Sequence, residues 1–207
     1  MNSSILSKCY YIVLIAFLFL IIACNSDIQP ATQASESTTE APFKNIVLLP
    51  ELQRYFPPEF YIGHFILYDL HKDQYHIYND SISNRSFCPA STFKILNSLI
   101  ALQTGIIPDT NFILEWDGRD RGWDKWNQDQ TIKTAVKYSA LWFFQEVARS
   151  VQAKDSSLYQ DFLDRAEYGN QSLSEDIELF WLDNSLQISP MQQIDFLVKL
   201  YKGNLPF

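Results

Sequence analysis

The chain has 207 residues, and its 24 acidic against 16 basic side chains give a formal net charge of −8. Apolar residues make up 47% and aromatic residues 15% of the chain, which suffices for a sizeable core and excludes wholesale disorder. The chain has no basic run, which excludes nucleic acid as the main partner. Its 3 cysteines are too few for a disulfide framework, and its 3 histidines share one stretch, so we predict no metal site.

The first residues have the pattern of an export signal. Lys8 precedes an unbroken apolar run over residues 12–23, which spans roughly 18 Å as a helix and is short for a bilayer core. The run ends in Ala23-Cys24, which resembles the bacterial lipoprotein cleavage box. The resemblance implies that residues 1–23 are removed and that Cys24 carries a lipid, so that the protein is exported to the periplasm and meets the membrane only through this anchor. An ordinary signal peptide or an uncleaved anchor helix is the alternative.

Residues 24–42 are rich in Ser, Thr, Ala and Gln and predict a flexible tether ahead of a domain over 43–207. At the start of that domain, residues 61–68 and 75–78 are rich in β-branched and aromatic side chains and predict a hairpin that turns at 71–74. His64 and His76 lie on opposite arms, where they can be cross-strand neighbours with a structural role.

The rest of the domain predicts helices. After Pro89 the apolar side chains fall at helical spacing, and Gly105 followed by Pro108 ends that helix. Residues 111–130 predict a long ordered loop pinned by its indoles. Further helices are expected over 138–151, 157–165 and 190–201.

Ser91 and Lys94 are three residues apart at the start of the first helix, which puts both side chains on one face. A serine hydroxyl is a poor nucleophile until a neighbour takes its proton, and a lysine becomes a base when burial lowers its pKa. On this spacing alone, a serine that caps a helix and a solvated lysine remain an alternative.

Four segments, taken together, closely resemble the motifs of the class D serine β-lactamases. They are Pro89-Ala90-Ser91-Thr92-Phe93-Lys94-Ile95, Ser139-Ala140-Leu141, Tyr168-Gly169-Asn170 and Phe180-Trp181-Leu182. The resemblance implies an α/β (α+β) fold of the serine β-lactamase and penicillin-binding-protein transpeptidase type, in which an antiparallel sheet is packed with helices beside a helical subdomain. It also implies a β-lactam as substrate.

The resemblance also implies roles for single residues. Ser91 attacks the β-lactam carbonyl, and Lys94 takes up CO2 to form a carbamate that acts as the general base, with no other cofactor. Ser139 relays the proton, and the Trp181 indole N–H supports the carbamate. Without the resemblance, Ser139 reads as a helix cap and Trp181 as a core aromatic.

Three further residues are expected to shape the substrate pocket. Leu141 lines it where the family more often has valine, and Tyr168 and Asn170 shape it without taking part in the chemistry. Cys88, close to the nucleophile, is expected to be a small buried apolar filler.

One family motif, Lys-Thr/Ser-Gly on a strand beside the site, has no match, since Lys202-Gly203-Asn204 does not fit it. We therefore expect a chain truncated before that motif, with the C-terminal strands missing, the apolar faces of the hairpin left open and the activity weakened. A sensor-like module that is acylated without turnover, or an inactive remnant, is the alternative, and the sequence leaves the oligomeric state open.

Overall fold

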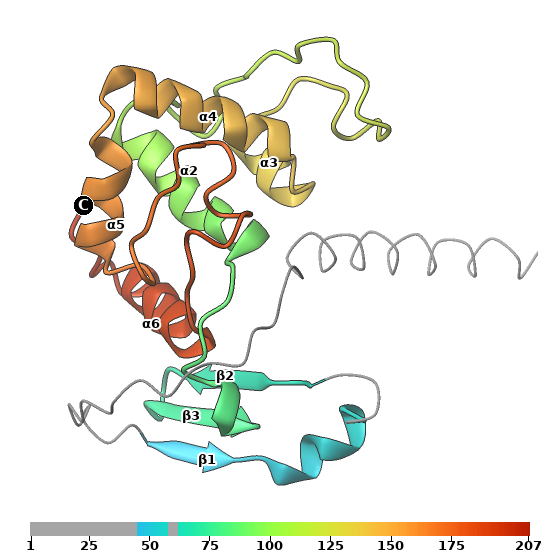
Figure 1. The fold of residues 1–207 in the computed structure, drawn as a ribbon, viewed down its shortest axis with the longest axis vertical. Coiled ribbons are helices and arrows are strands. Elements are labelled where there is room, and N and C mark those ends of the chain that lie inside the picture. The colour runs from blue at the N-terminus through green and yellow to red at the C-terminus, as the bar shows by residue number, and fades with distance from the viewer. Residues whose placement is uncertain (1–44, 58–61) are drawn as a thin grey trace, which may run out of the picture. The chain divides into compact units, whose positions relative to one another are not determined.

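The computed structural model describes residues 45–57 and 62–207, and Figure 1 shows how their helices and strands are arranged. The predicted signal segment, the lipidation site Cys24 and the tether lie outside the described residues, so they stay predictions. None of the helices in the described ranges combines the length and the hydropathy that crossing a membrane would require.

The sheet has three strands in the order β1-β3-β2. β2 (Phe65–Asp69) and β3 (Gln74–Tyr78) form the predicted antiparallel hairpin, although the first strand is shorter than expected. β1 (Ile46–Leu48) was not predicted and pairs in parallel with β3. A 3₁₀ helix, Pro50–Tyr55, follows β1. The structure therefore adds a third strand to the predicted hairpin.

His64 and His76 are not cross-strand neighbours, so that expectation is wrong. His76 lies opposite Leu67 in the hairpin, and His64 precedes β2. The Nδ1 atom of His64 instead lies 2.9 Å from the carbonyl oxygen of Tyr78, where it holds the end of β3. The role of His64 is structural, as expected.

The two faces of the hairpin differ, which corrects the expectation that both stay open. Tyr75 and Ile77 are buried and pack against Met191 of α6 (Pro190–Tyr201), and Tyr75 Oη donates to the Asp195 carboxylate at 2.6 Å. On the opposite face Phe65 is 39% exposed and Leu67 is 52% exposed. The face with Tyr75 and Ile77 is therefore covered by α6, whereas on the other face only the Tyr78 end is buried, under Phe56.

The helices form the larger core. α2 (Phe93–Gln103) packs against α4 (Leu141–Lys154), as Figure 1 shows. Phe93, Leu96 and Ile100 are fully buried in the core that the two helices share. α5 (Leu158–Ala166) and α6 begin and end within one residue of the predicted bounds.

The helix predicted over 138–151 is wrong at its start. The structure has α3 (Ile132–Lys137) and α4, separated at Ser139, whose φ of 51° lies in the left-handed region. The predicted ordered loop before α3 is confirmed: the Trp126 indole donates to the Tyr138 carbonyl at 2.9 Å and so fixes the break between the two helices.

Candidate active site

Ser91 and Lys94 are in direct contact. Ser91 lies in a short 3₁₀ turn, Ala90–Thr92, and Lys94 lies in the first turn of α2 that follows it. Lys94 Nζ donates to Ser91 Oγ at 2.9 Å, and Ser91 itself is exposed. A solvent-accessible hydroxyl therefore shares a hydrogen bond with a primary amine.

The Lys94 amine is buried among apolar groups. Its side chain is 5% exposed, and Nζ lies 5.8 Å from the centre of the Phe144 ring. Burial lowers the pKa of Lys94 from its ordinary value of 10.5 to about 8, because an apolar environment disfavours the ammonium form. No carboxylate of the described residues forms an ion pair with this amine. The alternative of a solvated lysine is therefore wrong.

Ser139 completes a cluster of three polar groups. Its Oγ lies 3.0 Å from Ser91 Oγ, although the two residues are far apart in the chain. α4 begins after Ala140 and has no side-chain cap, so the reading of Ser139 as a helix cap is wrong. A positive φ in a residue other than glycine costs of order 1–2 kcal/mol. Ser139 has such a φ, and so does Ala90, the residue before Ser91, with a φ of 46°. Backbone strain is therefore present on both sides of the Ser91–Ser139 contact.

Trp181 is fully buried behind the nucleophile. Its carbonyl accepts from Ala90 N–H at 3.0 Å and from the Cys88 thiol at 3.0 Å, and its ring stacks on Phe93 with centroids 5.5 Å apart. Cys88 is half-buried and donates a hydrogen bond, so its description as a purely apolar filler needs correcting.

The Trp181 indole N–H is the unusual feature of this segment. It is buried and has no hydrogen-bond partner among the described residues. An unpaired buried donor costs about 1–3 kcal/mol, and core packing alone does not explain it. The residues therefore fit an additional acceptor beside this indole N–H.

The three residues expected to shape the pocket differ in their surroundings. Tyr168 is fully buried and its hydroxyl donates to Gln193 Oε1 at 2.8 Å, so it acts from inside the core. The Asn170 side chain accepts from Gln187 N–H at 2.9 Å and fixes the loop that follows Tyr168. Leu141 is half-buried at the start of α4 and packs against the main core.

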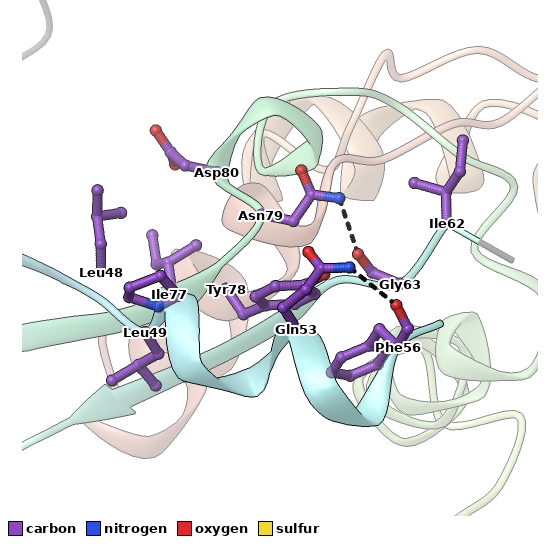
Figure 2. A pocket seen from close by; sticks show the side chains of 11 residues that line it. Leu48, Leu49, Gln53, Phe56, Ile62, Gly63, Ile77, Tyr78, Asn79 and Asp80 are labelled. Atoms are coloured by element: carbon purple, nitrogen blue, oxygen red, sulfur yellow. Dashed lines mark hydrogen bonds between the residues drawn. The ribbon is translucent and has the colours of Figure 1, made fainter. Parts of the chain in front are cut away.

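A cavity of about 430 Å³ lies elsewhere, between the 3₁₀ helix that follows β1 and the end of β3 (Figure 2). Phe56 stacks on Tyr78 there at 4.8 Å, the Tyr78 hydroxyl donates to Gln53 Oε1, and Asn79 donates to the Gly63 carbonyl. Ser91, Lys94 and Ser139 do not line this cavity. We therefore place the candidate site at Ser91 and not in the cavity. No group of His, Cys, Asp and Glu in the described ranges is placed to hold a metal ion.

Gln193 was not predicted as part of the site. It belongs to α6, and its amide reaches both Tyr168 and Thr92, the residue that follows the nucleophile. A glutamine that far along the chain carries no local signal of this contact.

Residues 56–205 match the penicillin binding protein transpeptidase domain family. The chain is 42% identical over 145 residues to the probable β-lactamase YbxI of Bacillus subtilis (strain 168), covering 70% of this chain and 53% of that protein. It is 37% identical over 145 residues to the regulatory protein BlaR1 of Bacillus licheniformis, covering 70% of this chain and 24% of that protein. The crystal structure of a class D β-lactamase from Sebaldella termitidis ATCC 33386 superposes with a TM-score of 0.74 at 38% identity, covering 80% of this chain and 65% of that one.

These comparisons confirm the predicted fold class and the predicted resemblance. The chain spans about half the length of YbxI.

Proposed function

Because the chain belongs to the penicillin-binding-protein transpeptidase family and is a homologue of the class D serine β-lactamases, we propose that it hydrolyses β-lactams through an acyl-enzyme on Ser91. The observation that carries this proposal is the position of Ser91 Oγ, 2.9 Å from the buried Lys94 amine and 3.0 Å from Ser139 Oγ. This contact gives an exposed hydroxyl both a base and a proton relay.

The pKa of Lys94 sets how much base is present. With a pKa of about 8, about one amine in ten is neutral at pH 7, whereas at the ordinary value of 10.5 fewer than about one in a thousand would be. A neutral amine accepts the Ser91 proton directly. It is also the form that reacts with CO2, whereas an ammonium does not.

We propose that Lys94 works as its carbamate, which would supply an anionic oxygen as a base near neutral pH. Two observations support the fit. The amine lies in an apolar environment that favours its neutral form, and the Trp181 indole offers a buried N–H that no described residue accepts. The role of Trp181 in this proposal is to donate that N–H and hold the anion in a site with little water.

The chemical steps balance within these residues. Ser91 Oγ bonds to the β-lactam carbonyl carbon as Lys94 takes its proton, and the carbon–nitrogen bond of the ring breaks. Ser139, in hydrogen-bond contact with Ser91, passes its proton to the departing nitrogen, and the proton held by Lys94 replaces it. In the second half, Lys94 takes a proton from water, and the hydroxide formed attacks the ester carbonyl. The bond to Ser91 Oγ breaks, and Lys94 returns the proton to that oxygen and restores the hydroxyl.

A chromogenic cephalosporin, followed by turnover and by intact mass together, tests this function. Continued turnover that rises with added bicarbonate is expected. The absence of both turnover and adduct would refute the proposal, and turnover that ignores bicarbonate and survives Lys94→Ala would refute the proposed base.

A penicillin receptor without turnover is a second candidate, and the similarity to the regulatory protein BlaR1 favours it. A receptor needs Ser91 to be acylated and the adduct to persist. In the same experiment a stable adduct with no further product would assign this role in place of hydrolysis.

Export and lipid anchoring at Cys24 also remain proposals, supported by the sequence of the first 24 residues. In cells fed a labelled fatty acid, the chain should carry the label and Cys24→Ala should not. A label retained by Cys24→Ala would exclude this anchor.

A further inference from the structure

Gln193 connects three segments that are far apart in the sequence. From α6 its Oε1 accepts from the Tyr168 hydroxyl at 2.8 Å and from the Thr92 hydroxyl at 3.3 Å. Its Nε2 is buried and has no hydrogen-bond partner among the described residues. The amide therefore bridges α6, the loop after α5 and the turn that carries Ser91.

Tyr168 gives this bridge a fixed end. Its ring is fully buried and packs edge-on against Phe93, with centroids 5.8 Å apart, and against Phe196, at 5.1 Å. Burial raises the pKa of the Tyr168 phenol, so it stays a neutral donor around pH 7. Gly169 follows with a φ of 59°, and a Cβ there would overlap the carbonyl of Gln187, so this loop has little freedom to move.

Thr92 is the other end of this bridge. Its backbone N–H donates to the Pro89 carbonyl at 3.0 Å and closes the turn that contains Ser91. Its hydroxyl has one proton, which it shares between the Pro89 carbonyl at 2.7 Å and Gln193 Oε1 at 3.3 Å. Thr92 is exposed, and the Gln193 amide is the side-chain contact that ties it to α6.

We propose that Gln193 is a positioning residue for the nucleophile, and this inference rests on the proposed acylation of Ser91. Its amide contacts both the buried Tyr168 and Thr92, and so holds the turn that contains Ser91 in place relative to Tyr168. The contacts of Ser91 with Lys94 and Ser139 are 2.9 Å and 3.0 Å long, near the middle of the hydrogen-bonding range. Because a misplacement of about 1 Å costs about 100-fold in rate, a smaller displacement of the turn should cost about 10-fold.

Three variants separate positioning from folding. Gln193→Leu removes the amide at similar size, and Gln193→Glu keeps an oxygen acceptor for Tyr168 and Thr92. Gln160→Leu is the matched control, because Gln160 is also a half-buried helical glutamine, in α5. Its amide donates to the Asp164 carboxylate at 2.7 Å and to the Gln171 carbonyl at 2.9 Å. Each chain is mixed with benzylpenicillin, and the rate of adduct formation on Ser91 is measured by intact mass across penicillin concentrations.

Gln193→Leu should lower the maximal acylation rate about 10-fold with little change in the half-saturating penicillin concentration. Gln193→Glu should recover most of this loss, and Gln160→Leu should keep the wild-type rate even if its Tm falls. Tyr168→Phe removes the same hydrogen bond from the other side, so the double variant with Gln193→Leu should lose no more than either single variant. Equal maximal rates in wild type and Gln193→Leu, or an equal fall in Gln160→Leu, would overturn the inference.

A fluorophosphonate, which labels activated serines without a β-lactam ring, keeps the two proposals apart. If the wild type reacts with the fluorophosphonate and not with penicillin, the proposed function fails, and the fluorophosphonate rates of the same variants decide the role of Gln193. If the wild type reacts with neither reagent, both proposals fail.

Discussion

Replacing Lys94 by methionine should stabilise the fold while it abolishes acylation of Ser91. Methionine has a similar length and no charge, so it fills the same apolar space beside Phe144. The pKa of Lys94 is lowered by burial from 10.5 to about 8, and each pH unit corresponds to 1.36 kcal/mol. The charged amine therefore costs the folded state about 3 kcal/mol at pH 7, which Lys94→Met should recover.

The pH dependence gives this prediction its sign. Below pH 8 the amine is protonated in both states and its full cost is present. Between pH 8 and 10.5 the unfolded chain keeps a proton that the folded chain has lost, so the stability of the wild type rises with pH relative to the variant. The advantage of Lys94→Met should fall from about 3 kcal/mol at pH 7 to about 1 kcal/mol at pH 9.5.

Urea unfolding in buffer depleted of CO2 measures this difference, because carbamate formation on Lys94 would add a second equilibrium. The exposed Lys202 provides a matched control, and Lys202→Met should change stability by less than about 0.5 kcal/mol at either pH. A Lys94→Met chain that is less stable than the wild type at pH 7 would refute the account of a desolvated amine. So would a stability difference between the two chains that is the same at pH 7 and at pH 9.5.

Three further predictions concern the surroundings of the nucleophile. Ser139→Ala and Ser139→Gly should both slow acylation at least about 10-fold. Because glycine suits the φ of 51°, Ser139→Gly should be about 1 kcal/mol more stable than Ser139→Ala in urea unfolding. Equal acylation rates in wild type and both variants would exclude the relay. Trp181→Phe keeps a ring beside Phe93 and removes an indole N–H that has no partner in the described part of the chain. Half-maximal turnover should then need about tenfold more bicarbonate, and an unchanged requirement would count against this role. Gly169→Ala should cost about 3 kcal/mol of stability, because its Cβ would overlap the Gln187 carbonyl. Gly105→Ala is the control and should cost about 1 kcal/mol, because Gly105 has a similar φ of 69° but no atom within 4 Å of the added Cβ. Equal losses in the two variants would contradict the close approach of Gly169 to Gln187.

The sequence predicted the elements whose signals are local. α6 shows why: Ser189 and Gln192 form a capping box, Pro190 takes the first helical position, and apolar residues follow at helical spacing. β1 was missed because three residues, Ile46–Leu48, carry too little pattern to stand out. The break at Ser139 was missed because the Trp126 indole, a contact from another segment, fixes it.

The candidate site divides in the same way. The contact of Ser91 with Lys94 followed from a spacing of three residues, which any helical turn brings together. The approach of Ser139 rested on the family resemblance, because no local rule links the turn ahead of α2 with the break between α3 and α4. The bridge through Gln193 depends on where α6 docks, and only the fold reveals it.

Peptide mapping of the penicillin adduct tests the central claim most directly. The chain is incubated with benzylpenicillin, digested, and searched for the mass of the opened β-lactam, in wild type and in Lys94→Met. The account predicts an adduct on the peptide that contains Ser91 in the wild type and its loss in Lys94→Met. An adduct on any other residue, an unmodified wild type, or an equally acylated Lys94→Met would contradict it.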